Sequence, residues 1–363
     1  MKVAMTGAGG FLGWHTRAAL RESNVDVSPI SMGDAFDDAA AVAAASSERF
    51  IHIAGVNRGT DPEVQDGNLR FAQQAAFAIT TAIEPPRVVV FANSTQSKNG
   101  SVYGEAKARA AATLATAAER VGAEFIDLQL PNLYGEHGRP FYNAVTSTFC
   151  RLLADGDTPM VEQDKELTLL HAQDAADALT GAIPPSGVEA KAERERVSGL
   201  LGRLEQMAAT YRGGDMPDVS AAFDRNLFNT YRSYTFPEQA PVRLTRHADA
   251  RGSFFEIIRT HGGTGQSSFS TTAPGVTRGD HFHRRKIERF TVLSGCAVIR
   301  LRRLFTDDVI EFAVDGDAPA AVDMPTMWSH SIENIGDELL YTSFWTNDIF
   351  NPVSPDTIAE AVR

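Results

Sequence analysis

The chain has 363 residues, enough for two domains at roughly 100–200 residues each. Its formal charge of -12 argues against nonspecific binding to nucleic acid or to an anionic membrane, because both need clustered positive charge. No apolar run approaches the ~18–20 residues that span a bilayer. From its charge and its apolar runs together, the sequence predicts neither a nucleic-acid nor a membrane partner. Its two cysteines, Cys150 and Cys296, favour a reducing, cytoplasmic location.

The first half of the chain alternates short apolar runs with alanine-rich helical patterns. We expect buried strands at residues 2–5, 25–30, 49–53, 87–92 and 124–129. Helical patterns cover residues 11–21, 36–45 and 103–121. Strands that alternate with helices predict an α/β Rossmann-type fold, a doubly wound parallel sheet with right-handed crossovers. Pro29 weakens the second strand and is expected to mark its exit.

The pattern changes after a linker with two prolines at residues 234–241. Before the linker, residues 189–211 are predicted to form a helix with an apolar stripe. After it, we expect short strands at residues 254–259, 267–272, 289–302, 308–314 and 339–345. No long helical pattern interrupts them, which predicts a small all-β sandwich or barrel. We therefore expect one domain at residues 1–236 and a second at residues 237–363.

A glycine-rich segment, Thr-Gly-Ala-Gly-Gly-Phe-Leu-Gly at residues 6–13, follows the first strand and opens a helix. Glycine permits a tight turn and a close approach of the backbone to a pyrophosphate, and the helix N-terminus presents free N–H groups to the phosphates. The segment predicts a nicotinamide-dinucleotide site that includes Gly7, Gly10, Phe11, Leu12 and Gly13.

The end of the second strand bears on the choice of cofactor. NAD requires an acidic residue there to bind the ribose 2′-hydroxyl. This sequence has serine, proline, isoleucine and serine at residues 28–31, and Asp34 comes only later. Arg17 could pair with a 2′-phosphate, although a solvated helix residue is the competing interpretation. The sequence therefore favours NADP without excluding NAD.

Tyr103 and Lys107 lie four residues apart on a helix that follows the fourth strand, so they share one face of that helix. An ammonium group beside a phenol lowers the phenol pKa and can also hold a ribose. The phenol can then exchange a proton with a carbonyl or alcohol during hydride transfer. Ser94, at the end of the fourth strand, is placed to hydrogen-bond the same oxygen, with Thr95 as the alternative. We predict catalytic roles for Tyr103, Lys107 and Ser94.

Residues 1–185 resemble the extended short-chain dehydrogenase/reductase superfamily. The resemblance rests on motifs in family order: the glycine-rich segment, residues 52–55, Asn68, Ser94, Tyr103 with Lys107, and Leu-Pro-Asn-Leu-Tyr-Gly at residues 130–135. It implies an NAD(P)-dependent enzyme, commonly of nucleotide sugars, with Ala54 and Gly55 also at the cofactor. It further implies that Asn132 and the loop of residues 139–143, including Arg139 and Asn143, face the sugar nucleotide.

The second domain carries a pattern of metal-type ligands. His281 and His283 alternate along a predicted strand and therefore share a face. Glu288 returns on the neighbouring strand, and His330 follows farther on. Three imidazoles and one carboxylate form a suitable site for Zn, Mn, Fe or Ni.

The spacing of these ligands resembles the two motifs of the cupin superfamily, which implies a jelly-roll fold. Met327 stands where the second motif has a glycine. Residues 249–256 and 266–281 also resemble the opening pattern of the dTDP-4-keto-6-deoxyhexose 3,5-epimerase family, in which His281 would be the catalytic base. The phenolic acid of that family falls near Phe350, which cannot donate a proton. Whether His281 is a metal ligand or a base is left open.

Over nearly its full length, and in residues 132–150, 166–171, 278–289 and 344–356 above all, the chain resembles the bifunctional CapF-type enzymes of capsular polysaccharide synthesis. The resemblance implies a UDP-2-acetamido-2,6-dideoxy-4-hexulose substrate on the route to UDP-N-acetyl-L-fucosamine. It implies C-3 epimerisation in the cupin domain and NADPH-dependent C-4 reduction in the first domain, and it implies a homodimer with zinc. The two steps share a ketone at C-4, which acidifies the C-3 hydrogen and then accepts hydride.

Three other interpretations compete with a bifunctional enzyme. One is a single-function reductase or epimerase whose cupin domain binds metal for stability or dimerises. Another is a sugar-nucleotide-binding or regulatory protein, which would not need the proton donor Tyr103. The last is an iron-dependent cupin dioxygenase fused to a reductase.

Overall fold

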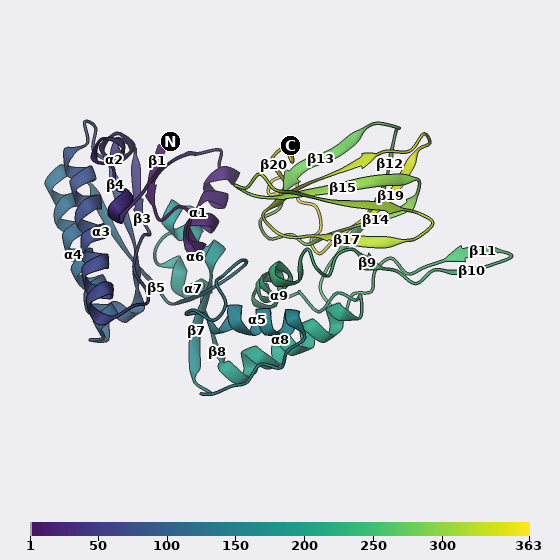
Figure 1. The fold of residues 1–363 in the computed structure, drawn as a ribbon, viewed down its shortest axis with the longest axis horizontal. Coiled ribbons are helices and arrows are strands. Elements are labelled where there is room, and N and C mark those ends of the chain that lie inside the picture. The colour runs from purple at the N-terminus through teal and green to yellow at the C-terminus, as the bar shows by residue number, and fades with distance from the viewer. Residues whose placement is uncertain (1) are drawn as a thin grey trace. The chain divides into compact units, whose positions relative to one another are not determined.

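A five-stranded parallel sheet forms the centre of the N-terminal part of the chain (Figure 1). The structure, a computed structural model, describes residues 2–363. The strands lie in the order β2-β1-β3-β4-β5. Their bounds are β1 (Lys2–Thr6), β2 (Asp26–Ile30), β3 (Arg49–His52), β4 (Val88–Ser94) and β5 (Glu124–Leu130). Pro29 lies in β2, an edge strand, where a missing N–H costs least.

Helices cover both faces of this sheet, as the predicted doubly wound fold requires. On one face, α2 (Asp38–Ala45), α3 (Asp61–Thr81) and α4 (Val102–Val121) pack against Val89 and Phe91. On the other, α1 (Phe11–Glu22) and α6 (Ala172–Thr180) pack against Val90. Successive residues of β4 thus point to opposite faces, and both faces are buried, which explains the continuous apolar runs in the sequence.

Contacts divide the chain into two compact units, which we describe separately. The first comprises the chain up to Tyr134 with residues 138–144 and 165–195. It also holds β6 (Asn132–Tyr134), β7 (Glu166–His171), α7 (Gly187–Lys191) and two short 3-10 helices, η1 (Gly33–Ala35) and η2 (Thr95–Lys98). The strand β8 (Glu193–Arg196) pairs in a three-stranded sheet with β6 and β7.

The second unit contains α5 (Val145–Asp155), α8 (Val197–Arg212), α9 (Ala222–Thr235) and two five-stranded sheets. One sheet has the order β12-β19-β14-β17-β9 and the other β16-β15-β18-β13-β20. The bounds are β9 (Val242–Arg243), β12 (Gln266–Thr272), β13 (Thr277–Phe282), β14 (Glu288–Ser294), β15 (Cys296–Arg303), β16 (Val309–Asp315), β17 (Ala320–Met324), β18 (Trp328–Asn334), β19 (Leu340–Thr346) and β20 (Ile358–Ala359).

All strand pairs of these two sheets are antiparallel, and Phe290, Ile299, Leu301, Val322 and Ile332 belong to the core cluster of the sandwich. The predicted all-β second part is therefore confirmed. The predicted boundary after residue 236 stays a prediction. It falls between α9 and β9, whereas α8 and α9 belong by their contacts to the unit that contains the sandwich.

Three predicted elements differ from the structure. The predicted helix 189–211 is two helices, α7 and α8, separated by β8. The predicted strand 289–302 is also two, because the chain turns at Gly295, whose φ of 91° suits glycine. The predicted strand 254–259 is wrong: β11 (Gly252–Phe254) ends where that strand was expected to begin, and it pairs with β10 (His247–Asp249) in a hairpin that extends away from the sandwich (Figure 1).

A buried ion pair joins α8 to the sandwich. Arg289 on β14 donates to Asp323 on β17 at 2.7 and 2.9 Å, and the phenol of Tyr211 donates to the same carboxylate at 2.8 Å. Arg289 also donates to the main-chain oxygen of Gly214 at 3.1 Å. These bonds satisfy a charge pair that would otherwise be costly to bury.

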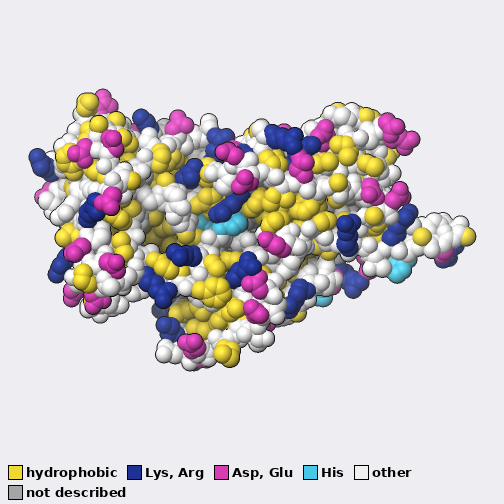
Figure 2. All heavy atoms as spheres, in the orientation of Figure 1, with side chains coloured by type: hydrophobic (Ala, Val, Ile, Leu, Met, Phe, Trp, Pro, Cys, Tyr) yellow, Lys and Arg dark blue, Asp and Glu magenta, His cyan; other side chains and the backbone are white. Residues whose placement is uncertain are grey.

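The charged surface is mixed in sign. On the face shown in Figure 2, acidic and basic side chains are interspersed. Within residues 2–363, no helix combines the length and the apolar character needed to cross a membrane.

Candidate functional site

The glycine-rich segment forms a tight loop between β1 and α1. Gly7 has a φ of 70°, and a Cβ atom there would lie 2.8 Å from the main-chain nitrogen of Ala54. A Cβ atom on Gly13 would lie 2.0 Å from the main-chain oxygen of Gly7. Only glycine fits at these two positions, so the first turn of α1 can approach the end of β1 as closely as a dinucleotide site requires.

Thr6 and His52 fix the segment after β3 beside this loop. The Thr6 hydroxyl accepts hydrogen bonds from the main-chain nitrogens of Ile53 and Ala54 at 3.1 and 3.2 Å. The same hydroxyl lies 2.8 Å from Nδ1 of His52. Burial, and then the charge of Lys107, lower the pKa of His52 to about 3, so this imidazole is neutral at physiological pH. Residues 53–55 therefore line the glycine loop, where the sequence places the cofactor.

The loop after β2 carries an ion pair that the sequence did not reveal. Arg70 on α3 donates to Asp34 at 2.6 Å, and both side chains are largely exposed. Arg17 lies on α1 and is half-buried. The acidic residue nearest the end of β2 is thus already paired with a cation.

Tyr103 and Ser94 meet at the carboxyl end of β4. Burial raises the pKa of the Tyr103 phenol, and the neighbouring Ser94 hydroxyl acts in the opposite direction. Ser101 caps the N-terminus of α4 by accepting from the nitrogen of Gly104 at 3.1 Å, which fixes the first turn that holds Tyr103. Of the two hydroxyls considered, Ser94 is the one in contact with the phenol.

Lys107 is buried one helical turn after Tyr103. Its ammonium donates to the main-chain oxygen of Ala92 at 2.7 Å and lies 4.1 Å from the centre of the Phe91 ring. Burial lowers the pKa of Lys107 to about 7, and the carboxylate of Asp127 acts against this shift. Asp127 also accepts from Asn93 at 2.7 Å. Sequence reasoning missed Asp127, which belongs to β5 and is distant in sequence.

The predicted substrate loop is held against the segment after β3. Arg58 donates to the main-chain oxygen of Tyr142 at 3.0 Å, and Asn143 donates to that of Asn57 at 3.3 Å. The guanidinium of Arg139 lies 4.8 Å from the centre of the Tyr142 ring. Asn132 donates to Thr168 on β7 at 3.1 Å and is exposed. Arg58 was missed, although it follows the family-type segment 52–55 directly.

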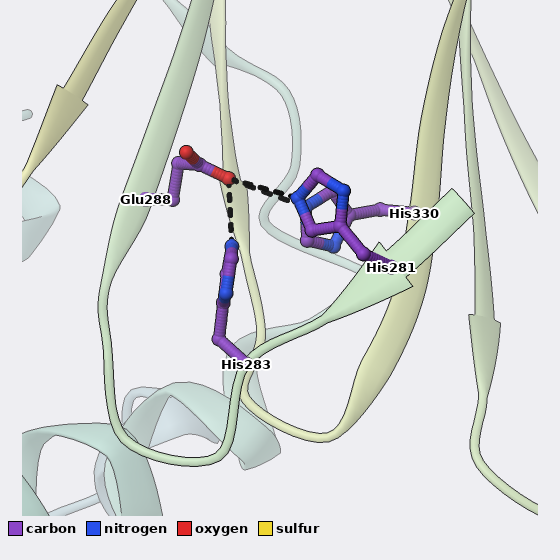
Figure 3. A group of neighbouring side chains, drawn as sticks. All are labelled: His281, His283, Glu288 and His330. Carbon is purple, nitrogen blue, oxygen red and sulfur yellow. Dashed lines mark hydrogen bonds and ion pairs between the residues drawn. The ribbon is translucent and has the colours of Figure 1, made fainter. Parts of the chain in front are cut away.

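The four predicted metal ligands converge in the β-sandwich (Figure 3). Their ligand atoms all lie within 4.8 Å of one another. His281 lies on β13 opposite His330 on β18, His283 follows β13, and Glu288 begins β14. One carboxylate oxygen of Glu288 lies 2.9 Å from His283, 3.2 Å from His330 and 3.9 Å from His281. The predicted shared face of His281 and His283 is confirmed.

The hydrogen bonds of two of these histidines indicate a cation site. Nδ1 of His283 lies 2.6 Å from the main-chain oxygen of Asp356, and Nδ1 of His330 lies 3.1 Å from that of Trp328. A carbonyl oxygen only accepts, so both Nδ1 atoms carry hydrogen. In neutral rings both Nε2 atoms then present lone pairs to the carboxylate of Glu288. Three acceptors that face one point need a cation between them, which is the arrangement of a metal site.

The electrostatics of the group agree with that arrangement. Burial lowers the pKa of His330 to about 4, so its ring is neutral at physiological pH. Burial alone would raise the pKa of Glu288, but the neighbouring histidines hold it well below its usual value, so its carboxylate is charged. A charged carboxylate beside a neutral imidazole is suited to bind a divalent metal.

Met327 occupies the position where a glycine was expected. Its φ of 60° lies in the left-handed region, and its side chain is fully buried. Its nitrogen donates to the main-chain oxygen of His283 at 2.7 Å. The backbone therefore keeps the conformation that favours glycine, and the turn before His330 remains joined to the ligand segment.

A cavity of about 190 Å³ lies beside Glu288 on the core-facing side of the sheet β12-β19-β14. Its wall includes one cationic side chain, Lys286, and the polar side chains of Gln266 and Ser268. Phe350 also lines it and is largely exposed. The residue expected at the position of a phenolic acid is thus beside the metal-type group, but it carries no proton to donate.

The fold and these two sites define a class: a Rossmann-type α/β unit with a tyrosine–lysine pair, followed by a jelly-roll sandwich with a metal-type ligand group. Residues 75–189 match the NAD dependent epimerase/dehydratase family, and residues 247–358 match the polysaccharide biosynthesis C-terminal domain. In Pseudomonas aeruginosa, UDP-2-acetamido-2,6-beta-L-arabino-hexul-4-ose reductase is 29% identical over 100% of this chain and 99% of its own length.

Solved structures extend the comparison. The capsular polysaccharide assembling protein CapF from Staphylococcus aureus is 30% identical, with a TM-score of 0.63 over 99% of this chain and 100% of its own. UDP-glucose 4-epimerase from Thermotoga maritima shares the fold at 14% identity, with a TM-score of 0.53 over 64% of this chain and 98% of its own. The chain belongs to the CapF family.

Proposed function

We propose that the protein is a bifunctional nucleotide-sugar enzyme. The β-sandwich epimerises C-3 of a UDP-2-acetamido-2,6-dideoxy-4-hexulose, and the α/β unit then reduces C-4 with NADPH, on the route to UDP-N-acetyl-L-fucosamine. The name of one full-length relative supports a UDP-2-acetamido-2,6-dideoxy-hexulose substrate and its reduction, and the name of the other supports a role in capsular polysaccharide assembly. The observation that carries the proposal is that one chain holds both a phenol–hydroxyl pair beside a buried lysine and a group of imidazoles beside a cavity.

In the reductase unit, NADPH supplies hydride to C-4 when bound. Tyr103 donates a proton to the oxygen that forms there, and Ser94 hydrogen-bonds that oxygen. Lys107 holds the ribose and stabilises the phenolate. The residues assigned to the cofactor are Gly7, Gly10, Phe11, Leu12, Gly13, Arg17, Ala54, Gly55, Tyr103 and Lys107. Asn132, Arg139 and Asn143 are assigned to the UDP-sugar.

NADPH is proposed over NADH because the end of β2 offers no unpaired acid. Asp34 is bound to Arg70, so it does not present an isolated negative charge to a 2′-phosphate. Arg17, in the first helix after the glycine loop, supplies the positive partner.

In the β-sandwich, His283, Glu288 and His330 are proposed to hold zinc, because two imidazoles and a carboxylate are a common catalytic zinc set. When bound, a zinc ion would polarise the C-4 ketone. His281 is proposed as the base at C-3. Its side chain is 22% exposed, against 2% for His283 and 0% for His330, and its Nε2 atom is farthest from Glu288. Lys286 in the cavity wall stabilises the enolate that forms.

One observation favours a second candidate, a single-function reductase whose sandwich is structural. Phe350 lines the cavity where a proton donor would be needed for inversion. A proton NMR time course in heavy water, with a UDP-4-keto-6-deoxy-N-acetyl sugar, separates the two. The bifunctional enzyme exchanges the C-3 hydrogen without NADPH and reduces C-4 when NADPH is added. Reduction without exchange would support the single-function enzyme, and neither reaction would overturn both.

The variant His281→Ala tests the assignment within the sandwich. If His281 is the base, C-3 exchange is lost while bound zinc is retained. Loss of zinc in the purified variant would instead make His281 the fourth ligand.

We further propose that the protein is a cytoplasmic homodimer. The hairpin β10–β11 is exposed at every residue, and Phe254 in it is 65% exposed. An isolated two-stranded hairpin is only marginally stable in water, so a second copy is expected to cover it. Sedimentation of the wild-type protein and of Phe254→Ser tests this, because the substitution should shift the equilibrium toward the monomer.

A further inference from the structure

A single aspartate outside the ligand group holds the segment that carries His283 and leads to Glu288. The carboxylate of Asp356 accepts three main-chain hydrogen bonds in a row, from Arg284 at 2.8 Å, Arg285 at 2.8 Å and Lys286 at 2.7 Å. These residues form the turn between β13 and β14. The distance between His283 and Glu288 is therefore set by a turn whose N–H groups are bound by one side chain.

The same residue also fixes the ring of His283. Its main-chain oxygen lies 2.6 Å from Nδ1 of His283, which requires the hydrogen to be on Nδ1 and leaves Nε2 to face Glu288. Asp356 has a φ of 43°, in the left-handed region. This conformation lets its carboxylate and its carbonyl bind neighbouring parts of one turn.

The chain on the far side of Asp356 is anchored to the ligand strand. β20 pairs with β13 so that Ala359 lies opposite His281 and Ile358 opposite Phe282. Lys286 donates to the hydroxyl of Thr357 at 3.1 Å. The pairing of β20 with β13 thus holds Asp356 in place, and the hydrogen bonds of Asp356 in turn hold His283.

We infer that Asp356 is a positioning residue for the metal site, which sets the tautomer of His283 and the spacing of His283 and Glu288. The inference rests on the proposed metal site. Outer hydrogen-bond partners of metal ligands typically contribute about 10–100-fold in affinity. Asp356→Asn replaces a carboxylate oxygen by an N–H donor that faces the N–H groups of the turn, so it should weaken metal binding by that factor.

The test is titration of the metal-free full-length protein with Co²⁺, followed by its visible absorption. Asp348→Asn is the matched control: it removes a carboxylate from the same cavity wall but not from the hydrogen bonds of the 284–286 turn. We expect wild type and Asp348→Asn to bind alike and Asp356→Asn to bind about 10–100-fold more weakly. Equal affinity of all three would overturn the inference and leave the metal site standing. Failure of the wild type to bind Co²⁺ would overturn both.

A second measurement does not depend on a folded variant. In the metal-free wild type, ¹⁵N-histidine NMR should show His283 with its hydrogen on Nδ1. A ring with its hydrogen on Nε2 would contradict the inference.

Discussion

The phenol of Tyr103, at the start of a helix, lies close enough to the hydroxyl of Ser94, at the end of a strand, for Ser94 to counteract the rise in the phenol pKa that burial causes. This contact places two proton-bearing groups at the carboxyl edge of the parallel sheet, where open α/β folds bind their ligands. The glycine loop after β1 lies at the same edge, which unites the predicted catalytic and cofactor residues.

Tyr103→Phe should lower NADPH oxidation with the keto sugar by about 10²–10⁴-fold, because the proton donor is removed. Exchange of the C-3 hydrogen with heavy water should continue, since that step is assigned to the sandwich. NADPH absorbance and proton NMR on one sample measure both. Simultaneous loss of both reactions would contradict separate sites.

Ser94→Ala should lower kcat for reduction by about 10²-fold, the effect of removing one donor to a developing oxyanion. Thr95→Ala removes the neighbouring hydroxyl and should leave kcat near the wild-type value. Steady-state kinetics on the pair decide between them. A larger loss in Thr95→Ala than in Ser94→Ala would reassign the role to Thr95.

Arg17→Ala should reduce the preference for NADPH over NADH by about 10-fold, because one charge-assisted hydrogen bond to the 2′-phosphate is lost. The effect should appear in KM for NADPH and not in KM for NADH. Arg21→Ala, in the last turn of the same helix, is the control. An unchanged preference in Arg17→Ala would show that Arg17 is an ordinary helix surface residue that does not bind the 2′-phosphate.

His52→Gln should make the protein less sensitive to acid. The pKa of His52 is lowered to about 3 in the fold, against 6.5 in the unfolded chain. Between pH 6.5 and 3 the unfolded chain therefore binds a proton at His52 that the folded chain does not. The free energy of unfolding falls as the pH is lowered through this window. Urea unfolding of wild type should lose roughly 1.4 kcal/mol per pH unit more than His52→Gln in that window. Parallel pH profiles would show that His52 does not titrate in this way.

The features that the sequence predicts well depend on local spacing. The glycines of residues 6–13 follow from the tight turn between one strand and the next helix. The Tyr103–Lys107 pair and the alternation of His281 and His283 follow from the period of a helix and of a strand. Such periods also predict the parallel sheet and the change to antiparallel strands. His330 could be added to the predicted ligand set, although it lies far from the other ligands in the sequence, because histidine is an uncommon residue.

The features that were missed depend on contacts between segments distant in sequence. Asp127 approaches Lys107 from another strand, and Asp356 reaches the turn at residues 284–286 across about seventy residues. Nothing in the neighbourhood of either aspartate marks it as special. The helix predicted at residues 189–211 failed for a related reason, since pairing of β8 with a neighbouring sheet outweighs local helical preference.

The ligands of the sandwich come from both of its sheets. His281, His283 and His330 belong to the sheet that contains β13 and β18 or follow it directly, whereas Glu288 belongs to the sheet that contains β14. An ion held by all of them would cross-link the two sheets. Its affinity would therefore depend on how closely the apolar side chains between the two sheets are packed. Phe290, whose ring lies 5.7 Å from that of His330, is one place where a change in apolar packing would be felt as a change in metal retention.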